Sequence, residues 1–169
     1  MPRFVLGALL AALLVPGPAA GQPDPGDVVV NEIMYAPSPS TNEFIELYNR
    51  SGSAVALDAL AFADANREFE PVTSADTMLA AGAYAVLVRT PEEFEAAFPS
   101  VAFFVPEGWA AYNNGGDTVY LRHSPSDTPL DSVPYDPSWG GSDDRSLERI
   151  DPAGPSDMAS NFADRKSVV

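Results

Sequence analysis

Short apolar segments recur along the sequence after residue 27, and turn-forming residues interrupt each of them. The 17 prolines and 12 glycines supply much of this punctuation. Runs of this length, rich in β-branched and aromatic residues and bounded by Gly, Pro, Asn and Ser, are typical of strands. The pattern therefore predicts an all-β fold, in which the inward residues of two packed sheets form the core.

The second apolar segment has the clearest alternation, because Ile45 and Leu47 fall on one face and Phe44, Glu46 and Tyr48 on the other. Such alternation is that of a half-buried strand, so we expect Ile45 and Leu47 in the core. The expected strands are Val28–Met34, Glu43–Asn49, Val55–Leu57, Leu60–Ala63, Phe69–Val72, Tyr84–Val88, Val101–Val105, Thr118–Arg122, Asp131–Tyr135 and Ser146–Ile150.

One short helix is expected between these strands. Thr90 can cap its start, Pro91 suits the first helical position, and Glu93 completes a capping box with Thr90. The helix should end by Pro99. The side expected to dock on a sheet carries Phe94, Ala97 and Phe98.

The first 21 residues have the profile of a cleavable signal peptide. A short cationic start with Arg3 precedes an apolar run, Phe4–Val15, which is too short to cross a bilayer. Cleavage is expected near Gly21/Gln22, followed by a flexible lead-in at residues 22–27. The alternative is a buried N-terminal helix. A signal peptide predicts a secreted, periplasmic or cell-surface protein, with no transmembrane segment after cleavage.

The amino-acid composition limits the classes of partner that the protein can bind. Arg3 lies in the expected leader, so the mature chain keeps 24 acids, 8 bases and a net charge of −16. Nucleic acid is excluded as a partner, because its binding needs Lys and Arg to neutralise phosphates. The scattered acids favour adaptation to a high-salt habitat over a few cation-binding loops. There is no cysteine, so packing alone must hold the fold.

Six segments occur in an order that identifies a known family. They are Val30–Tyr35, Glu43–Asn49, Leu79–Tyr84, Asn114–Leu121, Asp131–Val133 with Tyr135, and Ser146–Ile150. Together they resemble the bacterial lamin-tail domain, from about Val28 to Phe162. The resemblance implies an immunoglobulin-like β-sandwich that serves secreted or surface proteins as a non-catalytic module, often beside nucleases, phosphatases or other hydrolases. Nuclear lamins use theirs for protein contacts.

The chain departs from the family pattern in two places. Ala59-Leu60 stands where the family usually has Gly-Trp, so we expect a locally remodelled core. Residues 163–169 replace the usual family ending, which suggests a truncated tail and a longer gene product. The alternative function follows from this second departure: an accessory domain of an extracellular metal-dependent hydrolase or nuclease whose catalytic part lies elsewhere.

No catalytic set is recognisable, so we predict that the protein is not an enzyme. His123 is the only histidine, and no Gly-x-Ser-x-Gly elbow accompanies it. A single histidine without cysteine also excludes a zinc site of the usual kind. We expect His123 on a surface loop.

Charged residues in the best-matching strands are expected to hold the fold. Glu32, Glu46 and Glu148 include possible acid/base pairs for glycoside hydrolysis, but a structural role is favoured. We predict that Arg149 pairs with Glu46 or Glu32 in a structural charge network, because an unpaired buried charge is costly.

Asp136, Asp143 and Asp144 are weak calcium candidates around a Gly-Gly turn. An ordinary acidic turn is favoured, since the EF-hand spacing is missing; no other cofactor is expected. The aromatic residues Trp109, Tyr112 and Trp139 could form an exposed patch, although core positions are commoner for such residues.

These observations predict a non-catalytic binding or attachment module of the exterior or cell envelope. Its partner would be a protein or another envelope component.

Overall fold

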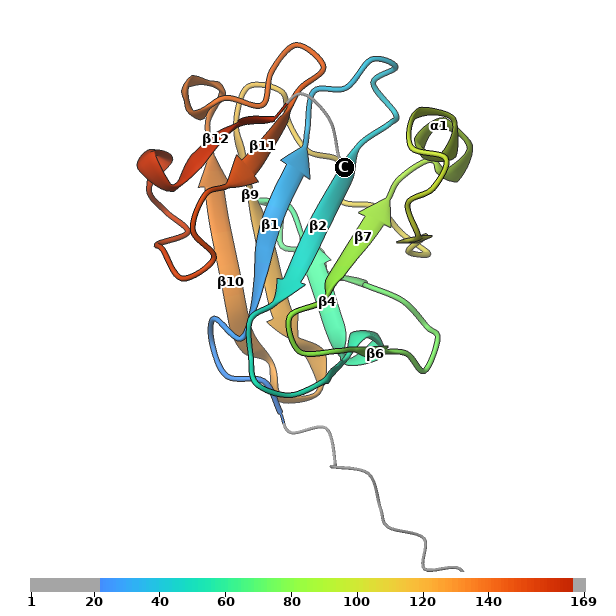
Figure 1. Ribbon diagram of the computed structural model, residues 1–169, viewed down its shortest axis with the longest axis vertical. Coiled ribbons are helices and arrows are strands. Elements are labelled where there is room, and N and C mark those ends of the chain that lie inside the picture. The colour runs from blue at the N-terminus through green and yellow to red at the C-terminus, as the bar shows by residue number, and fades with distance from the viewer. Residues whose placement is uncertain (1–21, 166–169) are drawn as a thin grey trace, which may run out of the picture.

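Two packed β-sheets form the body of the molecule in a computed structural model that describes residues 22–165 (Figure 1). The predicted signal peptide, residues 1–21, lies outside the described residues. The all-β prediction is confirmed, and strands predominate with a single α-helix among the described residues. No helix within residues 22–165 has the length and apolar character needed to span a bilayer.

The larger sheet has six strands in the order β12-β11-β1-β2-β7-β8. All neighbours are antiparallel except β7 and β8, which run parallel. Its strands are β1 (Val28–Met34), β2 (Phe44–Asn49), β7 (Tyr84–Val88), β8 (Phe103–Phe104), β11 (Ser146–Arg149) and β12 (Phe162–Arg165).

The smaller sheet has four antiparallel strands in the order β10-β9-β4-β5. Its strands are β4 (Leu60–Ala63), β5 (Glu70–Pro71), β9 (Asp117–His123) and β10 (Thr128–Tyr135). A separate pair joins β3 (Val55–Ala56) to β6 (Met78–Leu79). Four short 3-10 helices connect these elements: η1 (Leu57–Ala59), η2 (Ser124–Ser126), η3 (Pro137–Trp139) and η4 (Ala159–Asn161).

The core lies between the two sheets and consists of their inward-facing apolar residues. Ile45 and Leu47 are both 0% exposed, as the alternation in that segment predicted. Val119 and Val133 face them from the smaller sheet and are equally buried. Leu60, where the family usually has Trp, is also fully buried and fills that place in the core.

Helix α1 (Pro91–Ala97) docks on the outer face of the six-stranded sheet, at one end of β2. The ring of Phe44 meets the rings of Phe94 and Phe98 at centroid distances of 5.4 and 5.9 Å. These two contacts confirm the predicted docking side. Ala97 is exposed and takes no part in it.

The predicted capping box does not form. The Thr90 hydroxyl donates to the backbone oxygen of Thr41, and the Thr41 hydroxyl in turn donates to the carboxylate of Glu93. The two side chains of the predicted capping box, Thr90 and Glu93, therefore both form hydrogen bonds with Thr41, in the loop between β1 and β2. A tertiary contact replaces the local one.

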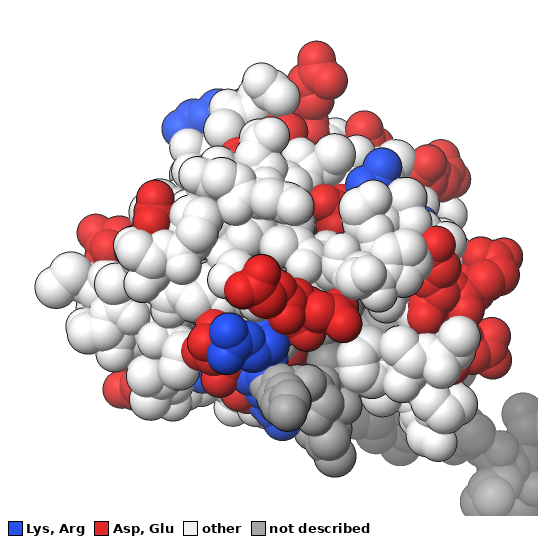
Figure 2. Space-filling view, turned by 90° about the horizontal axis from the view of Figure 1, so that it is seen from above, with Lys and Arg blue, Asp and Glu red and all other residues white. Residues whose placement is uncertain are grey.

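The longest strand, β10, begins three residues before its predicted start at Asp131, and two other strands have no predicted counterpart. The two-residue strand β6 was not predicted, and β12 runs to Arg165, three residues past the expected end of the domain at Phe162. Both strands depend on a partner in space: β6 on β3, and β12 on β11. Acidic side chains are spread over the molecular face shown in Figure 2, with few basic ones between them.

Candidate functional site

Three glutamates lie side by side on neighbouring strands of the six-stranded sheet. Glu32 of β1 is the register partner of both Glu46 of β2 and Glu148 of β11. These three residues are hereafter the acid row. They share the outer face, because Glu46 alternates with the inward-facing Ile45 and Leu47. A cavity of about 320 Å³ adjoins the row.

Each member of the acid row has a separate polar partner. The Ser146 hydroxyl donates to Glu32, and the Asn31 amide donates to Glu46 at 2.8 Å. Arg165 of β12 pairs with Glu148. The fold thus brings together the predicted residues Glu32 and Glu46, whose neighbouring carboxyl groups each accept a hydrogen bond from a different donor.

Burial raises the pKa of Glu32 to about 7, although the Ser146 hydrogen bond acts in the opposite direction. Repulsion by Glu46 adds to the increase. The pKa of Glu46 is also raised, chiefly by burial. Within residues 22–165, no group of three or more Asp, Glu or His side chains has an arrangement that could hold a metal ion, and the acid row is no exception.

Arg149 does not pair with the acid row, which corrects the predicted charge network. Its Nη2 donates to Asp131 Oδ2 at 2.8 Å, and its Nε donates to the backbone oxygen of Val30 at 2.9 Å. The side chains of Arg149 and Asp131 are 0% and 5% exposed. Arg149 lies on the inward side of its sheet, so its nearest carboxylate comes from β10 of the opposite sheet.

Asp131 ties the two sheets together through this contact. Besides Arg149, its carboxylate accepts from the backbone nitrogen of Val30 at 2.8 Å and from the Ser156 hydroxyl at 2.5 Å. The backbone nitrogen of Ser132 also donates to it. Arg149 therefore has the predicted structural role, but its partner is Asp131. The sequence did not indicate this partner.

The three calcium candidates have separate places in the loop before β11. Asp136 caps η3 by accepting from the backbone nitrogen of Ser138, and these hydrogen bonds lower its pKa. Asp144 accepts from the backbone nitrogen of Ser38 at 2.9 Å. Asp143 and Asp144 are exposed and have left-handed backbone conformations.

His123 ends strand β9 and is half-buried, so it lies at a strand end and not within a loop. Its Nδ1 is 2.7 Å from Ser126 Oγ in the following turn. Ser126 Oγ is in turn 2.7 Å from Thr128 Oγ1. Ser126 lies in η2 and Thr128 begins β10, so these contacts close the hydrogen-bonded turn between β9 and β10.

The aromatic candidates belong to the core cluster. Tyr112 is 4% exposed, and Trp109 and Trp139 are partly buried against the same cluster. The Trp109 indole donates to Glu43 at 2.8 Å, and Arg89 pairs with the same carboxylate at 2.9 Å. Sequence reasoning missed Glu43 as a buried charge.

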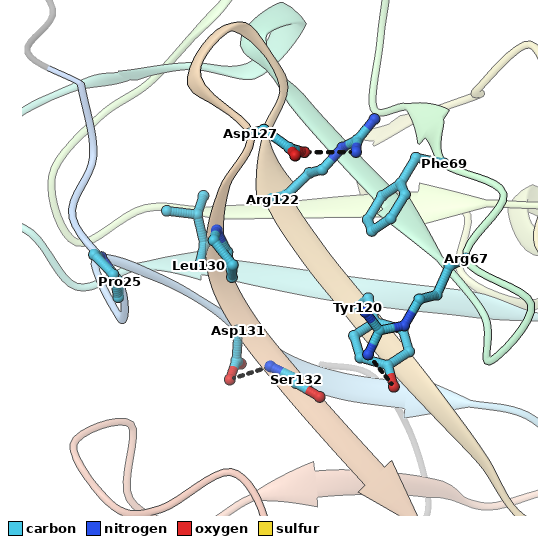
Figure 3. A pocket seen from close by; sticks show the side chains of 10 residues that line it. Pro25, Arg67, Phe69, Tyr120, Arg122, Asp127, Leu130, Asp131 and Ser132 are labelled. Atoms are coloured by element: carbon cyan, nitrogen blue, oxygen red, sulfur yellow. Dashed lines mark hydrogen bonds and ion pairs between the residues drawn. The ribbon is translucent and has the colours of Figure 1, made fainter.

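A second cavity, of about 640 Å³, lies beside β9 and β10 (Figure 3). Two arginines stack on aromatic rings along its wall. The guanidinium carbon of Arg67 is 4.5 Å from the centre of the Tyr120 ring, and that of Arg122 is 3.9 Å from the centre of the Phe69 ring. The four residues Arg67, Phe69, Tyr120 and Arg122 are hereafter the arginine pocket.

The fold assembles the arginine pocket from two places in the chain. Tyr120 and Arg122 alternate along β9 and so share its outer face, whereas Arg67 and Phe69 come from the connection between β4 and β5. Arg67 has a left-handed backbone with φ of 59°. Sequence reasoning missed this site, because no local spacing relates residues 67–69 to residues 120–122.

Charge pairing within the arginine pocket is weak. Arg122 bonds Asp127 at 2.7 Å, but the Asp127 side chain is 78% exposed. None of the salt bridges of the described residues involves Arg67, which donates a 3.3 Å hydrogen bond to the Tyr120 hydroxyl. In a chain with 24 acidic residues, a guanidinium without a carboxylate partner is available to a ligand.

Comparison with known families supports the fold. A family model described as Lamin Tail Domain matches residues 21–137, which is more than half of the chain. The chain belongs to the Lamin Tail Domain family. The family resemblance is thereby confirmed, with five of the six segments inside the matched span, and so is the immunoglobulin-like fold. No curated protein matches the chain.

The lamin tail domain family is an immunoglobulin-like, non-catalytic one, and the match covers most of the arrangement described above. It includes all four residues of the arginine pocket and two members of the acid row, Glu32 and Glu46. Strands β11 and β12 lie beyond residue 137, yet they complete the six-stranded sheet beside β1. The domain in this chain therefore extends past the matched span.

Proposed function

We propose that this lamin tail domain is a secreted, non-catalytic module that attaches to a protein or another component of the bacterial cell envelope. The observation that carries the proposal is the arginine pocket. Convergent polar groups in an apolar cavity of several hundred cubic ångströms are the usual features of a binding site. The signal-peptide profile of residues 1–21 supports export.

The chemistry of the described residues supports binding over turnover. The His123–Ser126 contact lies in a surface turn, and neither the acid row nor the arginine pocket combines a nucleophile with a base and an orienting group in the contacts of residues 22–165. The arginines instead present guanidinium groups, which recognise anionic groups of a partner.

Retention of envelope components tests the proposal. The full-length protein is exported from a bacterial host, immobilised, and exposed to envelope and cytosolic fractions in turn. We expect saturable retention of a component from the envelope fraction. The double variant Arg67→Ala/Arg122→Ala should lose that retention by about tenfold or more, because arginines at the centre of an interface often carry much of the affinity.

The matched control is Arg50→Ala/Arg145→Ala, which removes the same charge from two arginines outside the pocket. Arg50 is exposed, and the Arg145 side chain is 42% exposed. This control should retain the envelope component. Equal loss in both double variants, or no loss in either, would contradict a binding role for the arginine pocket.

A further inference from the structure

We infer that the arginine pocket binds a carboxylate carried beside an apolar side chain, as on an acidic residue of an extended segment of a partner protein. This inference rests on the proposed binding function and names the chemistry that the pocket recognises. It starts from the arrangement of the two guanidinium groups in Figure 3, where Arg67 lies across Tyr120 and Arg122 lies between Phe69 and Asp127.

Stacking on aromatic rings fixes the two guanidinium planes before a ligand arrives. A guanidinium held in this way loses less conformational freedom on binding than one on a free side chain. Its edge keeps N–H donors in a fork whose spacing fits the two oxygens of a carboxylate. The pocket is therefore organised in advance for an anionic planar group.

The existing partner of Arg122 can be displaced. Asp127 occupies the turn between β9 and β10, and its side chain is 78% exposed. Exposed ion pairs of this kind contribute little, because water solvates both charges nearly as well. An incoming carboxylate that buries apolar surface at the same time can exchange with Asp127 at low cost.

The residues that line the rest of the cavity indicate which kind of ligand presents the carboxylate. Pro25, Pro129 and Leu130 line the side of the cavity near β10, together with the polar residues Asp131 and Ser132, and the rings of Phe69 and Tyr120 line the other. Aliphatic or aromatic side chains gain free energy when buried against such walls. A sugar is disfavoured because the guanidinium groups already cover the ring surface on which it would stack.

The net charge also favours a short acidic segment over a polyanion. The expected mature chain carries −16, so a ligand with many charges is repelled as a whole. A single carboxylate experiences much less of this repulsion and can still form a charge-assisted hydrogen bond with a guanidinium group of the pocket. The site therefore fits an isolated acidic residue between apolar ones.

Two matched peptides test the inference: acetyl-Leu-Glu-Phe-amide and acetyl-Leu-Gln-Phe-amide. Binding to the full-length protein is followed by amide chemical shifts in NMR. We expect the Glu peptide to bind about tenfold more tightly than the Gln peptide, because its hydrogen bonds are charge-assisted. The shifts should centre on residues 67–69, 120–122 and 129–132.

Three variants test whether the preference for the Glu peptide arises in the arginine pocket. Arg67→Ala/Arg122→Ala should abolish the preference for Glu, whereas Arg50→Ala/Arg145→Ala should preserve it. Asp127→Asn should raise the affinity for the Glu peptide by about two- to fivefold, because it removes the competing carboxylate. The amide spectrum of each variant shows whether it remains folded.

Equal affinity for the two peptides, or shifts elsewhere on the surface, would overturn the inference, as would the absence of binding by either peptide. Tighter binding of trigalacturonate than of the Glu peptide would overturn it in favour of an acidic sugar. These outcomes differ from failure of the proposed function: an envelope component lost only in Arg67→Ala/Arg122→Ala would still support that function, with a different ligand chemistry.

Discussion

Glu32 is a carboxyl group that the fold holds away from water, with only 1% of the residue exposed. Its pKa rises from 4.5 to about 7 on folding. Between these two values the folded state binds a proton that the unfolded state has released, so stability falls as the pH rises through this window. Ionised Glu32 therefore costs about 3 kcal/mol above pH 7, by the free energy of a shift of this size.

Glu32→Gln should remove this penalty, because the amide oxygen can still accept from the Ser146 hydroxyl without carrying a charge. We expect the variant to be more stable than the parent by up to about 3 kcal/mol at pH 8 and similar to it at pH 4. Urea melts at the two pH values measure this. Glu92→Gln, at an exposed position of α1, is the control, and a difference independent of pH would contradict the account of Glu32.

Asp131 and Asp127 both pair with an arginine but differ in burial, with side chains 5% and 78% exposed. Asp131→Asn leaves the buried Arg149 charge without compensation and should cost about 3 to 5 kcal/mol. Asp127→Asn should change stability by less than about 1 kcal/mol. Denaturant melts of the two variants decide this, and equal costs would mean that the Asp131–Arg149 contact does not join the sheets as described.

The sequence indicated that Arg149 is structural but gave no means of choosing its partner. That choice depends on which face of the sheet the side chain occupies and on which strand of the other sheet lies opposite. The arginine pocket was even less predictable, since the stacking of Arg67 on Tyr120 corresponds to no pattern in the sequence. Pairwise contacts across sheets follow from topology, which local periodicity does not encode.

At the scale of the element, most strands were predictable, whereas β6, β12 and the 3-10 helices were not. Strands β1, β4 and β7 begin and end at the predicted residues. Strand β6 and the four 3-10 helices have two or three residues each, too few for a periodic signal. They exist because neighbouring elements fix the backbone there. The helix was predictable from its apolar spacing, whereas its cap was not, because Thr41 competes for both capping groups.

The loop between η3 and β11 depends on its second glycine. Gly141 has φ of +79°, and a Cβ there would lie 2.7 Å from the Tyr35 ring and 2.8 Å from the Leu147 Cβ. Gly141→Ala should therefore cost about 2 to 4 kcal/mol through strain and overpacking. A Cβ at Gly115 meets nothing within 4 Å, so Gly115→Ala should stay within about 0.5 kcal/mol. Thermal melts compare the two, and equal stabilities would contradict this packing.

At the scale of the whole molecule, the expected net charge of −16 should oppose folding through mutual repulsion. Screening shortens the Debye length from about 10 Å at 0.1 M salt to about 3 Å at 1 M, so sodium and potassium chloride should raise the melting temperature equally. Asp143→Asn/Asp144→Asn tests a specific calcium effect, since asparagine also tolerates their left-handed backbones. If calcium raised the melting temperature of the parent and the other salts did not, and if the double variant lost this effect, general screening would be contradicted.

We propose that the outer face of the four-stranded sheet contacts a partner through the arginine pocket. Site-specific photo-crosslinking in intact cells tests it most directly, with a photoreactive amino acid in place of Ser132, which lines the pocket, or of Tyr84, which is 53% exposed on the six-stranded sheet. We expect a discrete crosslinked product from position 132 and none from position 84. A product from position 84 alone, or from neither position, would contradict it.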